Sequence, residues 1–523
     1  MKRTVLFLIP LLMLVACERD DGAGGSLPSD SDERVYHGMI QLGEKLDDPY
    51  TVENMKQALA SLYPTKSERI DVVTTDLYAR FLPQDESQLH ALEDMGLTLL
   101  DHPMDYRIVR EGDYYQDPSL AEDAITWQYA VVPRDFTFPE GIEYEVLDEC
   151  YITEHDPLAK ADGDIDWELV ERESFRLTGN ADLLEPPTKA SVQPQGRITI
   201  EDPQFSGGKP FGVAGVEVAC NVFVKISTAY TDRDGYYQMT KKFSSKPRYR
   251  LVFQNIKGFK IGFNLILLPA SMSTLGKGEP EGLDARVTPD GDEAMFRRCV
   301  VNNAAYDYYN RCTDTDLGIT PPPADLRIWI LNGLSCSSAT MLHHGAFLDN
   351  SLLVSYLSYW LALIKIFLPD VTIGTQEQDY ADIYRRVVHE LAHTSHYAQA
   401  GNGYWSPYVD YVIRSFLTEG GEAYGSGQGD GAGYCELGEC WAYFMEESLF
   451  KDRYGGVIRQ YGNAFWFRPD IFTSLYEHGL SRADLYRGLK ESVTGLDDYR
   501  EELIQLYPDR ESTISQIFQR YGK

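Results

Sequence analysis

Residues 385–401, Arg-Arg-Val-Val-His-Glu-Leu-Ala-His-Thr-Ser-His-Tyr-Ala-Gln-Ala-Gly, contain the pattern that decides how the C-terminal half of the chain folds and what it holds. The run has no proline, apolar residues recur at helical spacing, and Gly401 is placed to end a helix. Residues four apart lie on one face of a helix, so the imidazoles of His389 and His393 can turn toward a single ion. Glu390 follows the first histidine directly.

Two imidazole nitrogens suit zinc, and a catalytic zinc site leaves one coordination position open for water. Such a zinc-bound water has a pKa lowered toward about 7, and Glu390 is placed to act as its general base. The pattern therefore predicts hydrolysis of peptide bonds with one zinc ion per chain. The alternative is a helix with two surface histidines, because His-Glu-x-x-His also arises in proteins that bind no metal.

A third protein ligand is needed, and its position decides the type of site. The metzincin pattern places a histidine six residues after the second histidine and a glycine at the third, but here these positions hold Gln399 and His396. A glutamate from a later helix remains. The downstream candidates are Glu422, Glu436, Glu439, Glu446 and Glu447.

Glu439 is the first choice, since the run Gly438 to Glu446 is expected to begin a helix with Glu439 in its first turn, where a buried carboxylate is tolerated. Aromatic residues in that run would pack against the histidine helix. Glu436 is second and Glu422 third. The combination of His-Glu-x-x-His with a later Gly-Glu and an aromatic helix resembles gluzincin-type zinc metallopeptidases found among bacterial lipoproteins. The resemblance covers roughly residues 275–523 and implies the metal ligands His389, His393 and Glu439.

The other histidines are expected to have lesser roles. His396 lies about 10 Å along the helix axis from His389, too far to share one ion, and is expected to be partly exposed. Nothing in the sequence fixes His343 and His344 near the metal. Tyr404 and Tyr443 are candidates for stabilising an oxyanion. The glycine-rich run 425–433 lacks the features of a phosphate loop and favours a lid or loop over the cleft.

The first residues predict export. Met1-Lys2-Arg3 is followed by an apolar run from Val5 to Ala16, which is too short to span a bilayer. It ends at Cys17 in a pattern that resembles the lipobox of bacterial lipoproteins, whose cysteine carries the lipid. An ordinary secretory signal is the alternative. Residues 17–33 are expected to form an acidic, Gly- and Ser-rich tether, and the expected location is the outer membrane of a Gram-negative bacterium. The acidic residues after Cys17 resemble a surface-export signal and favour exposure at the cell surface.

Composition narrows the function further. The 523 residues carry a formal net charge of −32, which argues against nucleic-acid binding because phosphates demand a basic surface. Eight cysteines are too few for a disulfide scaffold at this length. Cys435 and Cys440 are close enough in sequence to pair, although spacing alone does not decide it.

The remaining chain divides by pattern into further regions. Residues 34–195 predict a small α+β module of unassigned role, with a βαβ-like unit (strands at 71–81 and 97–101 around a helix at 86–95) and a linker from Glu154 to Gln195. Residues 196–270 alternate like a β-sandwich. The runs Gly212 to Val218 and Ala229 to Tyr237 resemble the carboxypeptidase regulatory-like, transthyretin-like domain. Residues 275–523 predict an α+β, helix-rich zincin-like domain. A strand is expected from Leu326 to Leu331, with the short run Val371 to Ile373 as its pairing partner, and helices are expected from Leu352 to Phe367 and from Tyr380 to Ala400.

The expected protein is thus multidomain, and its expected function is that of an exported, lipid-anchored zinc metallopeptidase acting on a protein or peptide. A cell-surface binding lipoprotein with a structural or inactive zinc site is the main alternative. A structural site would be closed by four protein ligands and would need no base such as Glu390, which favours the enzyme. A nuclease is disfavoured by the acidity of the chain and by the lack of an Asp-rich two-metal pattern.

Overall fold

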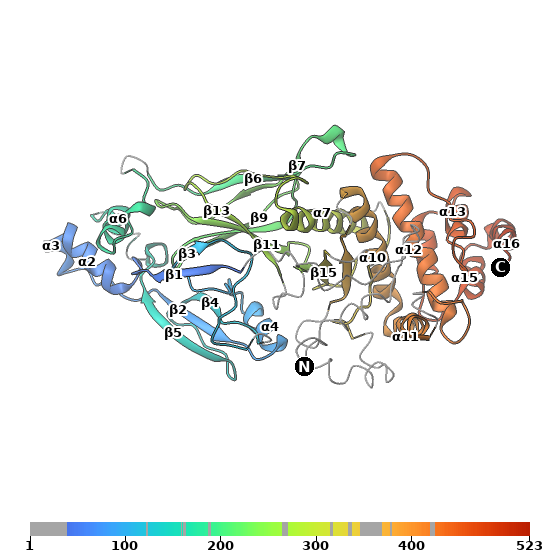
Figure 1. The fold of residues 1–523 in the computed structure, drawn as a ribbon, viewed down its shortest axis with the longest axis horizontal. Coiled ribbons are helices and arrows are strands. Elements are labelled where there is room, and N and C mark those ends of the chain that lie inside the picture. The colour runs from blue at the N-terminus through green and yellow to red at the C-terminus, as the bar shows by residue number, and fades with distance from the viewer. Residues whose placement is uncertain are drawn as a thin grey trace, which may run out of the picture.

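The protein is elongated (Figure 1). Helices of the N-terminal module lie at one end, its strands lie beside the β-sheets in the middle, and helices form the C-terminal end. The computed structural model describes residues 39–121, 124–157, 159, 164–186, 190–263, 270–313, 317–332, 337–345, 369–376, 379–418 and 424–523. The expected multidomain arrangement, with sheets in the middle and a helix-rich α+β C-terminal region, is confirmed.

The N-terminal module is built on an antiparallel sheet in the order β4-β2-β5. Its strands are β2 (Asp76–Leu82), β4 (Gln128–Pro133) and β5 (Glu143–Cys150). Helix α4 (Glu86–Asp94) begins after the cap Asp85, as the sequence predicts. The βαβ-like unit is wrong, however. Residues 97–101 contribute only an isolated bridge between Leu100 and Tyr129, because the sheet partners of β2 come from later in the chain.

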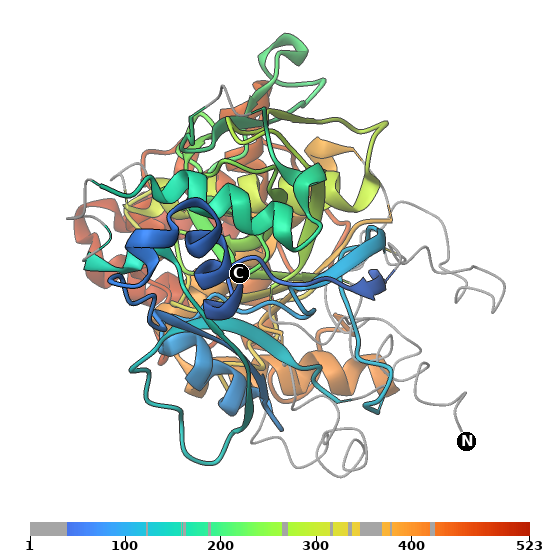
Figure 2. The ribbon, with the colours of Figure 1, turned by 90° about the vertical axis from the view of Figure 1, so that its left-hand side faces the viewer.

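Several short elements complete this module. They are β1 (Gln41–Lys45), α2 (Val52–Leu62), α3 (Pro64–Ser67), β3 (Tyr106–Arg110), the 3-10 turns η2 (Thr153–His155) and η3 (Ala181–Leu183), and α6 (Trp167–Leu177). Helices α2 and α6 pack against each other at the end of the molecule that Figure 2 faces.

The expected linker from Glu154 to Gln195 is also wrong, because this stretch contains α6. Glu171 of α6 is buried, accepts a hydrogen bond from the Tyr50 hydroxyl at 2.9 Å and pairs with Lys225 Nζ at 3.0 Å. The charges that look like those of a solvated linker are therefore paired inside the fold.

The middle of the molecule contains strands of two sheets. One has the order β10-β6-β14 with β7 on β6, and comprises β6 (Gln195–Ile200), β7 (Phe211–Gly212), β10 (Tyr236–Gln238) and β14 (Ala285–Val287). The other includes β8 (Val216–Val222), β9 (Lys225–Tyr230), β11 (Arg248–Asn255) and β13 (Met272–Lys277). The strand-rich prediction for this region is confirmed, while its transthyretin-like identity stays a prediction.

The second sheet continues into the C-terminal region in the order β16-β15-β12-β11-β8-β9. Strand β12 (Lys260–Phe263) pairs in parallel with β15 (Arg327–Leu331), which pairs in parallel with β16 (Val371–Gly374). The predicted pairing of the last two strands is confirmed. One sheet thus contains strands from both sides of the domain boundary expected between residues 270 and 275. The middle and C-terminal regions therefore share a continuous sheet.

Helices cover the C-terminal end of that sheet and then form the far end of the molecule. They are α7 (Glu293–Thr313), α10 (Tyr380–Ala400), α11 (Asn402–Thr418), α12 (Ala432–Tyr454), α13 (Asp470–Glu477), α14 (Arg482–Arg487), α15 (Leu496–Leu506), the 3-10 turn η5 (Pro508–Arg510) and α16 (Glu511–Arg520). A helix expected from Leu352 to Phe367 lies outside the described residues. Among the helices that are described, none is long and apolar enough to cross a membrane.

Candidate metal centre

Helix α10 carries both predicted histidine ligands and spans the range expected from the sequence. The Asp379 side chain caps its start by accepting the Ala381 N–H at 2.8 Å. Gly401 ends it with a positive φ of 73° and donates its N–H to the Tyr397 carbonyl at 2.7 Å. The sides of α10 pack against α7 and α12, which buries the whole motif.

Helix α12 supplies the carboxylate, but it begins at Ala432, six residues before the expected start at Gly438. Glu439 therefore lies well inside the helix, and the first-turn placement is wrong. Gly433, which the sequence placed in a loop, lies inside this helix. A Cβ built at this position would lie 2.4 Å from the Thr494 carbonyl oxygen, so this glycine allows a close helix packing and does not mark a loop. Trp441 fastens α12 to α10 by donating its indole N–H to the Ala392 carbonyl at 3.1 Å.

His389, His393 and Glu439 come together in the interior. The Nε2 atom of His389 lies 3.4 Å from Glu439 Oε2, and the Nε2 atom of His393 lies 3.4 Å from Glu439 Oε1. Ligands held at 2.0–2.1 Å in a tetrahedron are about 3.3–3.5 Å apart, so these separations fit a zinc-sized ion. The three residues form a buried group that could bind a metal.

Burial sets the protonation states in the direction that metal binding needs. It lowers the pKa of His393, an effect that the nearby Glu439 partly offsets, so the imidazole stays neutral. Burial alone would raise the pKa of Glu439, but electrostatic interaction with His393 and His389 and the hydrogen bonds from their rings lower it well below its usual value. Neutral imidazoles and an ionised carboxylate are the forms that bind a cation.

The other glutamates proposed as ligands have different partners: some pair with cationic side chains, and one contacts a metal ligand. Glu436 pairs with Lys523 and is not a member of the group formed by His389, His393 and Glu439. Glu446 lies 3.0 Å from the Nδ1 atom of His389, the ring nitrogen opposite the one facing Glu439. Glu447 pairs with Arg385 and accepts the Tyr461 hydroxyl at 3.0 Å. Glu422 lies outside the described residues, as does the lipidation candidate Cys17.

Glu446 orients His389, because a carboxylate on the far ring nitrogen holds the imidazole in the tautomer that presents Nε2 to a metal. Sequence reasoning included Glu446 only as a ligand. Its spacing, seven residues or two helical turns after Glu439, was the available signal that both face the same neighbour.

Tyr408 of α11 is a residue that sequence reasoning missed. Its hydroxyl donates to Glu439 Oε1 at 2.6 Å and its ring lies 5.7 Å from that of His393. Of the tyrosines proposed for oxyanion stabilisation, Tyr404 donates instead to the Tyr434 carbonyl at 2.7 Å. The ring of Tyr443 packs edge-on against His389 at 4.7 Å, and its hydroxyl bonds to that of Tyr424 at 3.0 Å.

His396 is fully buried, so its expected partial exposure is wrong. Its ring lies 4.4 Å from that of Tyr404 and 5.6 Å from that of Trp405, which enclose it. Burial lowers its pKa to about 3. Glu390, the predicted base, is 1% exposed and lies between the two histidine ligands on α10. Cys435 and Cys440 are both buried on α12, and no disulfide joins them.

Comparisons with known proteins do not assign the chain to a family. No protein-family model matches it, and no curated protein does. Among solved structures, the crystal structure of (S)-allantoin synthase matches with a TM-score of 0.13 and 14% identity, over 23% of this chain and 48% of that chain. A similarity of this size carries no argument about fold or function, so the function of this chain has to be argued from the site itself.

Proposed function

We propose that the protein is an exported zinc metallopeptidase of the gluzincin type. The observation that carries the proposal is the meeting of His389, His393 and Glu439 at 3.4 Å separations, with Glu390 on the same helix. Two imidazoles and one carboxylate are the ligand set of gluzincin-type catalytic zinc sites.

Zinc bound to this set supplies a Lewis acid that polarises a carbonyl and lowers the pKa of water. Glu390 accepts the proton of the attacking water as the new C–O bond forms, and delivers it to the departing amine nitrogen as the C–N bond breaks. Glu446 and Tyr408 act through the ligands: the first orients His389 and the second fixes one oxygen of Glu439.

The number of ligands separates catalysis from a purely structural role. Within the part of the chain that the structure describes, the buried group has three metal-binding members, whereas structural zinc sites are closed by four. A buried carboxylate at Glu390 also has no purpose in a closed structural site. Both features support an open coordination position.

A binding lipoprotein with an inactive zinc site is the second candidate, and burial favours it. His389, Glu390, His393 and Glu439 are each exposed by 3% or less. A substrate has to reach the ion for cleavage, so the access route decides between the two candidates.

The proposal also includes the cellular location of the protein. Cleavage of the signal before Cys17 and lipidation of that cysteine would anchor the protein to the outer membrane of a Gram-negative bacterium. Labelling with an alkyne fatty acid tests this: the wild type should take up the label and Cys17→Ser should not. Equal labelling of both would contradict it.

Peptidase activity is tested on a mixed peptide library analysed by mass spectrometry. The purified protein should generate new peptide termini, lose this activity after treatment with a zinc chelator, and regain it when one equivalent of zinc is returned. If the zinc-loaded protein cuts no peptide, the binding-lipoprotein candidate replaces the peptidase.

A further inference from the structure

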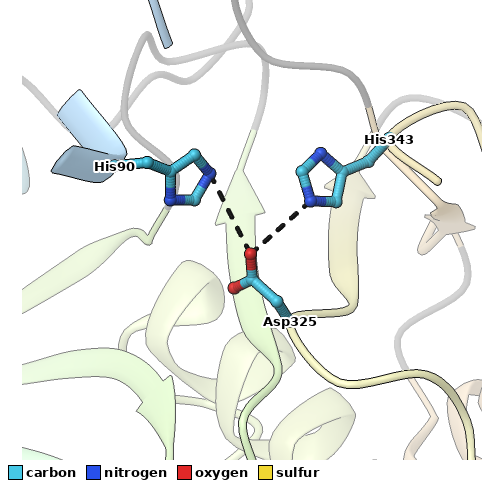
Figure 3. A group of neighbouring side chains, drawn as sticks. All are labelled: His90, Asp325 and His343. Atoms are coloured by element: carbon cyan, nitrogen blue, oxygen red, sulfur yellow. Dashed lines mark ion pairs between the residues drawn. The ribbon is translucent and has the colours of Figure 1, made fainter. Parts of the chain in front are cut away.

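A second cluster of two histidines and a carboxylate lies between the N-terminal module and the C-terminal region. His90 comes from α4, Asp325 lies two residues before β15, and His343 lies between β15 and β16 in the sequence. Figure 3 shows the two imidazoles on either side of the Asp325 carboxylate. None of the three residues belongs to the buried centre on α10 and α12.

The spacing of the donor atoms is close to that of a metal site. Asp325 Oδ2 lies 3.5 Å from His343 Nε2 and 4.0 Å from His90 Nε2. All three donor atoms lie within 4.8 Å of one another. A tetrahedral ion at about 2.0–2.1 Å from its ligands requires edges of about 3.3–3.5 Å, so a contraction of roughly 1 Å would complete the site. The three side chains are partly exposed, so solvent reaches the cluster.

The far nitrogen of each imidazole also faces a carboxylate. His90 Nδ1 lies 3.2 Å from Glu93, and His343 Nδ1 lies 3.6 Å from Glu86. Metal-binding histidines usually have such a partner, because it fixes the tautomer and makes the other nitrogen a better donor. The buried centre has the same arrangement, with Glu446 on His389.

Two cationic side chains compete for the same carboxylates. Arg327 contacts both Glu86 and the Nε2 atom of His90. Lys260 pairs with Glu93 at 2.5 Å and with Asp325 Oδ1 at 3.7 Å. Glu86 and Glu93 thus balance the two cations, and Asp325 Oδ2 is the oxygen left facing the histidines. An incoming ion has to displace Arg327 from His90, so this site should bind more weakly than the buried one.

We propose that His90, Asp325 and His343 form a second metal site, which takes a divalent transition-metal ion such as zinc and clamps the N-terminal module to the C-terminal region. Imidazole donors with one carboxylate select this class of ion over calcium or magnesium, which prefer oxygen ligands. Partial exposure leaves water to complete the coordination shell.

The clamp is connected to the helix that holds the buried centre. The carbonyl of His344, next to His343, accepts a hydrogen bond from the Tyr397 hydroxyl at 3.0 Å, and Tyr397 lies four residues after His393 on α10. His344 Nδ1 also lies 2.9 Å from Asp370, which holds this segment beside β16. Metal binding at the clamp would therefore fix α4 against a segment already tied to α10.

Zinc titration of the chelator-stripped full chain, followed by competition with a chromophoric chelator, counts the sites. The wild type should bind one tight and one weaker equivalent. His90→Ala and His343→Ala should each lose the weaker equivalent and keep the tight one, whereas His393→Ala should lose the tight one. His478→Ala, which removes a histidine of α13's C-terminal end, is the matched control and should keep both.

A measurement on the wild type alone avoids variants that fail to fold. Crystals grown with zinc should show an anomalous peak at the zinc edge among His90, Asp325 and His343. Hydrogen exchange at the amides of α4 should slow at least about tenfold on adding the second equivalent, and this effect should be lost in His343→Ala.

Three results would overturn the second site. These are a single zinc equivalent in the wild type that His393→Ala removes, two equivalents in both His90→Ala and His343→Ala, or no anomalous peak at the cluster. A peak without protection of α4 would overturn the clamp. None of these outcomes depends on peptidase activity. A single equivalent that His90→Ala removes would instead count against the buried centre, so failure of the second site is distinct from failure of the proposed function.

Discussion

The two histidine and carboxylate clusters contain the same donor atoms in different surroundings. The buried centre takes both histidines from one helix, and Arg385 lies 3.8 Å from Glu446, the carboxylate behind His389. The cluster at His90 gathers its donors from three distant segments and shares its carboxylates with Arg327 and Lys260. Local charge balance, rather than donor identity, is expected to set the difference in metal affinity.

Removal of a ligand from the buried centre should have the largest effect. His393→Ala leaves one imidazole and one carboxylate, so zinc affinity should fall at least about 1000-fold, and peptide cleavage should fall to background. The comparison is with His90→Ala, which should leave both cleavage and tight zinc binding within about threefold of the wild type. Similar losses in the two variants would show that the clusters are not independent.

Acid should destabilise the fold through His396. This histidine is fully buried, whereas the histidines of the cluster at His90 are partly exposed. Its pKa is lowered from 6.5 to about 3, so the unfolded chain binds more protons than the folded one between these values. Stability is therefore complete above pH 6.5 and falls as the pH drops toward 3, by up to about 4 kcal/mol.

Urea unfolding of the metal-free protein as a function of pH measures this effect. His396→Phe should flatten the dependence between pH 6.5 and 3, because Phe fills the space beside Tyr404 without a titrating nitrogen. His478→Phe is the control and should retain the wild-type slope. An unchanged slope in His396→Phe would refute the assignment.

The carboxylate behind His389 should tune the buried centre by an intermediate amount. Glu446→Gln keeps the size of the side chain but weakens its pull on His389 Nδ1, so zinc affinity should fall about 10- to 100-fold. Glu93→Gln is the matched change at the exposed cluster. Glu93→Gln also frees Lys260 to move toward Asp325. It should therefore lower the affinity for the weaker zinc equivalent and leave the tight equivalent unchanged.

Tyr408→Phe should have the smallest effect. It removes the hydroxyl that donates to Glu439 at 2.6 Å and leaves the ring packed near His393. A hydrogen bond to a charged group contributes about 1.5–3 kcal/mol, part of which water or metal recovers, so a loss of about tenfold in zinc affinity is expected. Tyr404→Phe, which loses a bond to a backbone carbonyl instead, should leave zinc affinity unchanged.

The sequence predicts the buried centre better than the exposed cluster because of chain geometry. His389, Glu390 and His393 lie within two turns of one helix, so a periodicity of 3.6 residues predicts their common location. His90, Asp325 and His343 are brought together by packing between regions, for which no local pattern exists. Glu439 lies on a different helix, so its prediction required a contact between distant segments. The aromatic run around Trp441 indicated this contact, because Trp441 packs on α10.

The errors along the chain also have physical causes. The glycine-rich run before α12 suggested a loop throughout, but Gly433 lies inside α12, and it is a glycine because Thr494 approaches too closely for a side chain. The charged stretch around α6 suggested a linker, but Glu171 is neutralised by Lys225, a partner 54 residues later. Both errors come from contacts between distant segments, which composition does not report.

Zinc content and peptide cleavage measured together on Glu390→Gln test the central claim most directly, with Glu477→Gln on the exposed end of α13 as the matched control. A catalytic zinc centre predicts that Glu390→Gln keeps the tight zinc equivalent and loses cleavage at least about 1000-fold, whereas the control keeps both. Full cleavage by zinc-loaded Glu390→Gln, or a wild type that binds no tight zinc, would contradict the account.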